Sequence, residues 1–186
     1  MKPRRALVLI DFFNPSNFQG VKALAGPALR AARNTSRLKH RLRRLGVPAI
    51  YTNDNFGQWD SEFSTLVSRC AALHGASGEI ARLLSPQHGD RAILKPRHSA
   101  FYGTALEFLL EELGTELLIL TGTSTDSCIS VTAHDAHMRK FKLWIPSDCV
   151  ASPKPAYSRA ALAHLKRVTD ATIFPSMRES ALAPKS

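Results

Sequence analysis

Six short apolar runs divide the chain at fairly regular intervals. They do not alternate between polar and apolar positions, which is typical of strands buried on both faces of a sheet. Between them lie five segments with helical periodicity, several of which begin after a proline or a capping residue or end at a glycine. The runs cover 6–10, 48–52, 91–94, 117–121, 142–145 and 171–174, and the helical segments cover 27–45, 77–84, 104–113, 125–139 and 156–167. This alternation predicts an α/β protein with a six-stranded parallel sheet covered by helices on both faces.

Two stretches do not follow this alternation. Residues 54–70 mix polar turn formers with Phe56, Trp59 and Phe63 ahead of a possible helix. We expect this segment to cover a site as a partial wall. The end of the chain, from about 176 to 186, has little periodicity and is predicted to be a frayed tail.

The length and composition bound the architecture. A chain of 186 residues that is 44% hydrophobic is long enough for one domain, spanning 1–186, with a sizeable core. The three cysteines, Cys70, Cys128 and Cys149, form no CxxC pair, so neither a disulfide framework nor a zinc cluster is indicated. A reducing, cytoplasmic location fits this cysteine usage best. No apolar run has the length of a signal-peptide core or a membrane span.

The net charge of +10 raises the question of an anionic partner. Much of this charge lies within one predicted helix, over 30–44, that also carries an apolar stripe at roughly helical spacing. A solvated helix face is the favoured interpretation, because charge runs usually face water and no aromatic residues interleave with this one. Nucleic acid is therefore not the expected partner. The basic residues are Arg30, Arg33, Arg37, Lys39, Arg41, Arg43 and Arg44.

Three polar residues stand at the ends of apolar runs. Asp11 closes the first run, Lys95 closes the third, and Cys128 follows the fourth at the predicted start of a helix. If these runs are neighbouring parallel strands, a carboxylate, an ammonium group and a thiol meet at one edge of the sheet, where open α/β folds place their ligand sites.

This set of groups suits nucleophilic catalysis. A cysteine attacks as thiolate, which a helix start and the Lys95 charge would favour, and Asp11 could accept the thiol proton. The turn over 121–127 offers backbone amides for an oxyanion hole, which we assign to Ser124 and Cys128. Singly, each side chain has an ordinary structural explanation: a buried small residue, a turn cap or a solvent-facing lysine. Together they indicate a cysteine hydrolase.

Four segments carry a resemblance to a known family. They are ALVLIDFFN at 6–14, YTNDNFGQW at 51–59, ILKPRHSAFYGT at 93–104 and LILTGTSTDSCISVTAHDAHMRKF at 118–141. In these segments the chain resembles the isochorismatase-like cysteine hydrolases, which include nicotinamidases and N-carbamoyl amino acid amidases. The resemblance implies a three-layer α/β/α sandwich with a six-stranded parallel sheet and an Asp-Lys-Cys triad, carried onto Asp11, Lys95 and Cys128. It also implies a non-proline cis peptide bond, which we place between Thr123 and Ser124.

Two departures from the family refine the expected activity. Metal-binding nicotinamidases carry Asp-x-His after the second strand, whereas this chain has Asp54-Asn55-Phe56, so neither a metal nor another cofactor is expected. Isochorismatases proper lack the nucleophilic cysteine, whereas this chain has Cys128. The expected reaction is therefore cleavage of a small amide-type C–N bond, or an ester, through a thioester intermediate.

The remaining predictions concern partners. Residues that flank the triad in sequence are expected to contact a small-molecule substrate: Phe13, Asn14, Asn55, Trp59 and Phe101, together with Ser124. The family resemblance suggests a homo-oligomer with no membrane association. The alternative from another class is a non-enzymatic binding protein on the same fold, which would use its basic helix to bind nucleic acid or an acidic partner. The sequence does not identify the substrate.

Overall fold

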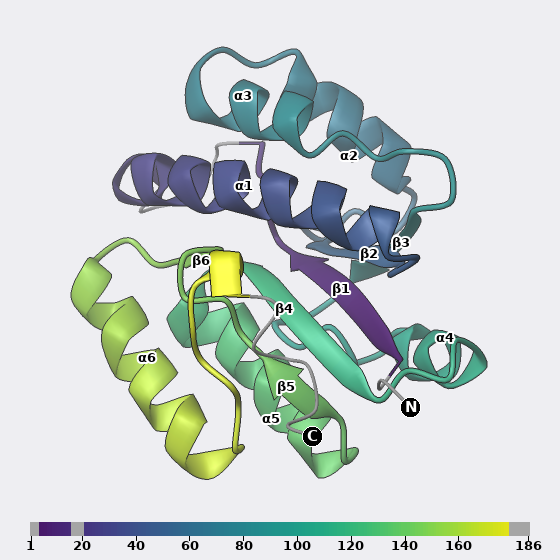
Figure 1. The fold of residues 1–186 in the computed structure, drawn as a ribbon. Coiled ribbons are helices and arrows are strands. Elements are labelled where there is room, and N and C mark those ends of the chain that lie inside the picture. The colour runs from purple at the N-terminus through teal and green to yellow at the C-terminus, as the bar shows by residue number, and fades with distance from the viewer. Residues whose placement is uncertain (1–3, 16–20, 179–186) are drawn as a thin grey trace.

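A single parallel sheet runs through the part of the chain that the computed structural model describes, residues 4–15 and 21–178 (Figure 1). The strand order is β3-β2-β1-β4-β5, with β6 paired to β4. The strands are β1 (Arg5–Ile10), β2 (Ala49–Asp54), β3 (Arg91–Lys95), β4 (Leu117–Thr123), β5 (Lys142–Trp144) and β6 (Val150–Ala151). Because all pairs are parallel, the carboxyl ends of β1, β2, β3 and β4 lie at one edge.

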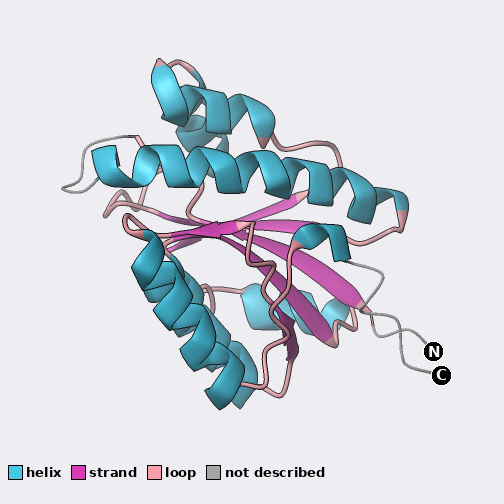
Figure 2. Ribbon diagram, turned by 60° about the vertical axis from the view of Figure 1, so that its left-hand side comes forward, coloured by secondary structure: helices cyan, strands magenta, loops and turns pink. Residues whose placement is uncertain are grey.

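The sheet separates two hydrophobic cores. Helices α1 (Val21–Arg44), α2 (Phe63–Ala71) and α3 (Gly75–Leu83) cover one face, and α4 (Leu106–Glu112), α5 (Ser130–Met138) and α6 (Pro155–Val168) cover the other (Figures 1 and 2). Side chains of a strand point alternately to the two faces. Accordingly, Leu7 and Leu9 belong to the first core, whereas Val8 and Ile10 belong to the second. The predicted α/β architecture with a six-stranded parallel sheet is confirmed.

The sixth strand lies elsewhere than the sequence pattern predicts. The prediction at 171–174 is wrong, because this segment forms only a single bridge, between Thr172 and Trp144. The strand β6 instead pairs with the carboxyl end of β4, with Gly122 opposite Val150. This position is open because β5 pairs only with the first three residues of β4, from Leu117 to Ile119.

Two helices also differ from their predicted extents. The helix expected at 125–139 is divided into a π-helical turn, η1 (Thr125–Ile129), and the regular helix α5. The helix expected to begin at residue 27 begins at Val21, and Pro27 lies inside it. Leu24 and Ala28 both belong to the core cluster of this face, so the buried side of α1 runs across the proline.

The segment 54–70 is only partly a loop. Helix α2 begins at Phe63, whose ring packs against Phe13 and Tyr51 at centroid distances of 5.3 and 5.5 Å. Phe63 was predicted to form part of a wall over the site. Its ring packs against the first core instead. Trp59, in the turn before α2, is 81% exposed.

The predicted tail begins too early. Ser176 is buried and is held by Asp148, whose carboxylate oxygens accept hydrogen bonds from the Ser176 amide at 2.7 Å and hydroxyl at 2.8 Å. Residues 179–186 of the predicted tail lie outside the described residues. Among the helices within residues 4–15 and 21–178, none is long and apolar enough to cross a membrane.

Candidate active site

The Asp11, Lys95 and Cys128 side chains meet at the carboxyl edge of the sheet. Asp11 directly follows β1, Lys95 is the last residue of β3, and Cys128 lies in η1 after β4. The Lys95 Nζ atom is 2.8 Å from Asp11 Oδ2 and 3.8 Å from Cys128 Sγ. The charge of Asp11 is close enough to act on the pKa of Cys128. The structure therefore brings together the three groups that the sequence places at strand ends.

The Lys95 ammonium group is fully buried but well supplied with acceptors. Besides Asp11, it donates to the Arg97 carbonyl at 3.1 Å and lies 3.9 Å from Asp54 Oδ2. A buried charge is costly to the fold unless it is paired and hydrogen-bonded. These contacts fix the ammonium group between two carboxylates and the sulfur of Cys128.

The Asp11 carboxylate is held at both oxygens. Oδ2 accepts from Lys95, and Oδ1 accepts from the backbone amide of Asp54 at 2.7 Å. Burial raises the pKa of Asp11 above its ordinary value, and the Lys95 charge opposes this rise. A carboxylate whose pKa is raised is a stronger base, which is the property needed to take a proton from a thiol.

Burial and the neighbouring charges act on the Cys128 thiol in different directions. Burial, reinforced by the neighbouring Asp11 charge, raises its pKa to about 12, although the Lys95 charge opposes the rise. The predicted activation of the thiolate by Lys95 and the helix start stays a prediction.

The turn between β4 and Cys128 brings backbone amides beside the sulfur. The Thr123–Ser124 peptide bond is cis. The Ser124 carbonyl accepts hydrogen bonds from the amides of Ser127 and Ile129, both at 3.1 Å. The same turn carries the amides of Ser124 and Cys128, which are the two predicted oxyanion donors.

Gly122 allows this turn to approach β1. Its φ angle is +131°, and a Cβ atom built at this position would lie 1.9 Å from the Ile10 carbonyl oxygen. No side chain fits at such a distance, and L-residues rarely adopt this φ. The glycine therefore lets the end of β4 lie against the end of β1, next to Asp11.

Two aromatic residues predicted to contact the substrate lie in the cores instead. The Phe13 ring is 1% exposed and packs against Tyr51 and Phe63. The Phe101 ring is 5% exposed, stacks on Phe141 and lies under the Arg139 guanidinium group. The prediction that these two rings contact a substrate stays untested.

The polar candidates have different surroundings. The Asn55 side chain is buried and accepts a hydrogen bond from the Gly57 amide at 2.9 Å, so it stabilises the turn after β2. Asn14 lines a cavity of about 30 Å³ together with Asp11 and Thr123. This volume is about that of one water molecule and is too small for a substrate. Trp59 is 81% exposed, and its predicted contact with a substrate stays untested.

Two residues near the triad were not predicted to contribute to it. Asp54 provides the backbone amide that binds Asp11 and a second carboxylate near Lys95. His98 places its Nδ1 atom 3.6 Å from Cys128 Sγ. His98 follows Lys95 by three residues in the segment KPRHSAF, but no sequence signal relates it to Cys128.

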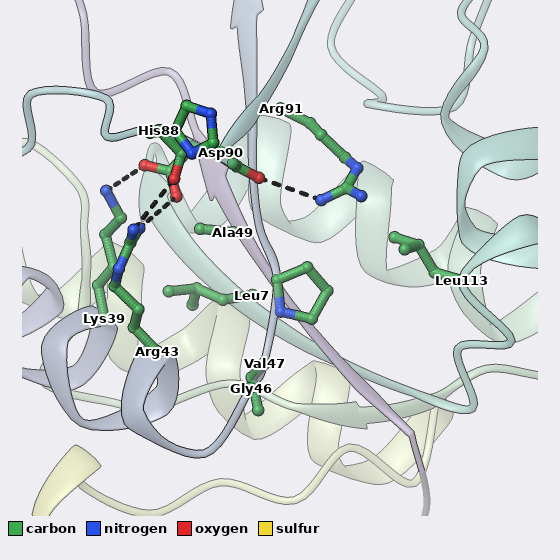
Figure 3. Close-up of a pocket in the computed structure, with 12 residues that line it drawn as sticks. Leu7, Lys39, Arg43, Gly46, Val47, Ala49, His88, Asp90, Arg91 and Leu113 are labelled. Carbon is green, nitrogen blue, oxygen red and sulfur yellow. Dashed lines mark hydrogen bonds and ion pairs between the residues drawn. The ribbon is translucent and has the colours of Figure 1, made fainter.

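Part of the charge on the basic helix is neutralised within the fold. Lys39 and Arg43 of α1 both pair with Asp90, at 2.5 and 3.5 Å, and Arg33 pairs with Glu79 at 2.7 Å. The Lys39 and Arg43 pairs line a cavity of about 450 Å³ at the amino ends of the strands, the edge opposite the triad (Figure 3). Binding of an acidic partner by this helix stays an untested alternative.

The donor set near the triad contains no evident metal site. Across residues 4–15 and 21–178, no group of three or more His, Cys, Asp and Glu side chains is placed to hold a metal ion. Phe56, two residues after Asp54, follows it in a turn and is 41% exposed. The expectation of a metal-independent reaction stays a prediction.

Comparison with known proteins gives consistent matches over the length of the chain. The family model described as the isochorismatase domain matches residues 5–173. The chain is 34% identical over 172 residues to YaaI, an uncharacterised isochorismatase family protein of Bacillus subtilis (strain 168), covering 92% of this chain and 94% of that protein.

Two solved structures share the fold. An isochorismatase family protein from Desulfovibrio vulgaris superposes with a TM-score of 0.76 at 22% identity, over 98% of this chain and all of the other. N-carbamoylsarcosine amidase from Thermoplasma acidophilum superposes with a TM-score of 0.66 at 27% identity, over 93% of this chain and 96% of the other.

Proposed function

This chain belongs to the isochorismatase family, and we propose that it is a cysteine hydrolase that cleaves a small amide-type C–N bond through a thioester on Cys128. The observation that carries the proposal is the meeting of Asp11, Lys95 and Cys128 within a few ångströms. The similarity to an N-carbamoylsarcosine amidase supports an amide or ureido carbonyl as the point of attack.

The first half of the reaction forms the thioester. Asp11 takes the proton from the Cys128 thiol as the sulfur attacks the carbonyl carbon, and the carbonyl oxygen becomes negative. The amides of Ser124 and Cys128 donate hydrogen bonds to this oxygen. The C–N bond then breaks, and Asp11 passes its proton to the departing nitrogen, which leaves as ammonia or an amine.

The second half returns the enzyme to its starting state. A water molecule attacks the thioester, Asp11 accepts a proton from this water, and the C–S bond breaks to release the acid. The sulfur recovers its proton from Asp11. Throughout the cycle Lys95 is the fixed positive charge that balances Asp11 and any charge on the sulfur.

The raised pKa values of Asp11 and Cys128 support this division of roles. Burial is the main cause of both rises. It makes the Asp11 carboxylate a stronger base and the Cys128 thiol a weaker acid. The nucleophile forms when a carbonyl is in place to receive it.

A substrate panel with matched cysteine variants tests the proposal. Primary amides, N-carbamoyl amino acids and small esters are incubated with the parent protein, and ammonia or acid release is measured. Cys128→Ala is expected to lower the rate by at least roughly a thousandfold on any substrate that the parent hydrolyses. Cys70→Ala, the same change in the core at α2, is the control and is expected to keep most of the activity.

Intact mass measurement adds a direct view of the intermediate. Rapid quenching during turnover is expected to show an acyl group on the parent protein and none on Cys128→Ala. Full activity of Cys128→Ala would refute the covalent mechanism.

A further inference from the structure

The Cys128 sulfur has two polar neighbours beyond the triad, the hydroxyl of the adjacent Ser127 at 4.0 Å and the imidazole of His98. His98 Nδ1 lies 3.6 Å from Sγ, within the range for a hydrogen bond that involves sulfur, and its side chain is exposed. Lys95 is fully buried and Asp11 is 14% exposed. The imidazole therefore lies on the open side of the sulfur, from which a substrate carbonyl must approach.

The backbone around His98 is held in place from both directions. Before it, the Arg97 carbonyl accepts a hydrogen bond from Lys95. After it, the Ser99 hydroxyl binds the Asp135 carboxylate, and the Ala100 amide donates to the Thr132 hydroxyl at 3.0 Å. These contacts link the segment to β3 on one side and to α5 on the other. The position of the imidazole is thus set by the same elements that set Lys95.

The triad alone gives the sulfur few donors when it becomes charged. Both Asp11 oxygens are engaged, and Asp11 carries the thiol proton at that stage. Lys95 divides its hydrogen bonds between Asp11, the Arg97 carbonyl and the sulfur, at 3.8 Å from the last. Burial works against the thiolate, since it raises the pKa of Cys128. A donor on the exposed side would stabilise the charged sulfur at the point where it meets the substrate.

We infer that His98 is a catalytic residue whose Nδ1–H donates a hydrogen bond to the Cys128 sulfur when Asp11 has taken the thiol proton. The inference deepens the proposed function and rests on it. No proton leaves His98 in this role: the S–H bond breaks, the proton moves to Asp11, and the imidazole only stabilises the resulting thiolate. It requires the tautomer that carries hydrogen on Nδ1.

Two substitutions distinguish hydrogen-bond donation by His98 from steric shielding of the sulfur by its ring. His98→Phe keeps a planar ring of similar size but removes the donor. His98→Asn loses the ring but keeps an N–H group near the position of Nδ1. Because His98 is exposed, neither change is expected to alter the melting temperature.

The measurement is the rate of Cys128 alkylation by iodoacetamide, which needs no amide substrate. His98→Phe is expected to slow alkylation about tenfold, since a hydrogen bond to a charged group is lost, while His98→Asn stays within about threefold of the parent. Mass analysis of the labelled peptide identifies Cys128 as the modified residue. Equal rates for the parent and His98→Phe, or equal losses in both variants, would overturn the inference.

The same variants in the amidase assay keep the two proposals apart. The rate constant kcat is expected to fall in His98→Phe and to recover in His98→Asn. If the parent hydrolyses nothing in the panel while the alkylation pattern holds, the proposed function fails and the contact between His98 and the sulfur stands. If the parent is active but both variants match it in alkylation, the role of His98 fails alone.

Discussion

Lys95 and Asp11 form an ion pair of 2.8 Å in which the ammonium group is completely shielded from water. A pair of this kind contributes little net stability, because the attraction is offset by the cost of removing both charges from water. The ion pair instead fixes the positions of the Lys95 ammonium group and the Asp11 carboxylate. Since β3 carries the cation and the residue after β1 carries the anion, with β2 between the two strands, the pair holds one end of the sheet together.

Replacing Lys95 by methionine is expected to harm both the fold and the reaction. The substitution keeps most of the side-chain volume but leaves the carboxylates of Asp11 and Asp54 without their shared cation. We expect a loss of about 3 kcal/mol in the free energy of unfolding and a fall of at least roughly a hundredfold in amide hydrolysis.

Chemical denaturation and the substrate panel measure the two effects of Lys95→Met. The control is Lys142→Met, which changes an exposed lysine at the start of β5. If Lys95→Met had the stability and turnover of the parent, Lys95 would be needed neither to pair with the two carboxylates nor for the reaction.

Replacing Asp11 by asparagine is expected to change alkylation and catalysis in opposite directions. The Asp11 charge is one of the causes that raise the pKa of Cys128 to about 12, so its removal lowers that pKa. More of the sulfur is then thiolate at a given pH, and the alkylation curve moves to lower pH. Amide hydrolysis falls at least roughly a hundredfold, because the proton acceptor is gone.

Iodoacetamide labelling between pH 7 and pH 10 follows the ionisation of Cys128 in this variant. Asp60→Asn, in the exposed turn before α2, should leave both the labelling curve and turnover as in the parent. If alkylation of Asp11→Asn were slower than that of the parent across this range, Asp11 would be promoting ionisation of the sulfur, and the expected shift to lower pH would be wrong.

A single methyl group at Gly122 is expected to disturb the site through the backbone. The added Cβ would overlap the Ile10 carbonyl and would require a φ that L-residues rarely adopt. We expect Gly122→Ala to lower the free energy of unfolding by more than about 2 kcal/mol.

Gly26→Ala is the matched control for that change. Gly26 lies on the exposed side of α1, and apart from its chain neighbours a Cβ there meets only the end of the Arg30 side chain, at 3.7 Å. Alanine favours the helix over glycine, but the ring of the following Pro27 opposes a Cβ in a helical conformation, so this variant should stay within about 1 kcal/mol of the parent. Urea denaturation compares the two, and equal effects would refute the steric argument.

Much of the fold follows from the sequence because its strands are buried on both faces. Continuous apolar runs such as that of β1 have few other uses in a protein of this size, and the polar residues after them mark the site edge. The strand β6 escaped prediction because two residues carry no periodicity. It forms only because β5 leaves the carboxyl end of β4 unpaired.

The site was less predictable where side-chain direction depends on local backbone geometry. Asp11 has a positive φ of 49°, so the alternation of β1 does not continue beyond it, and the Phe13 ring packs in the core. Phe101 is directed inward by the contacts of its loop with α5. The contact of His98 with the sulfur joins residues 30 positions apart, and no spacing rule relates them.

The strand that carries Lys95 is the outermost of its end of the sheet. β3 pairs with β2 alone within the described chain, and its first two residues, Arg91 and Ala92, are exposed. Outer strands of this kind detach at a smaller cost in free energy than the strands between two cores. Fraying of β3 is therefore expected to begin at Arg91 and Ala92, whereas the buried ion pair with Asp11 anchors the carboxyl end of the strand, so the half of β3 that carries Lys95 should be the last part of it to detach.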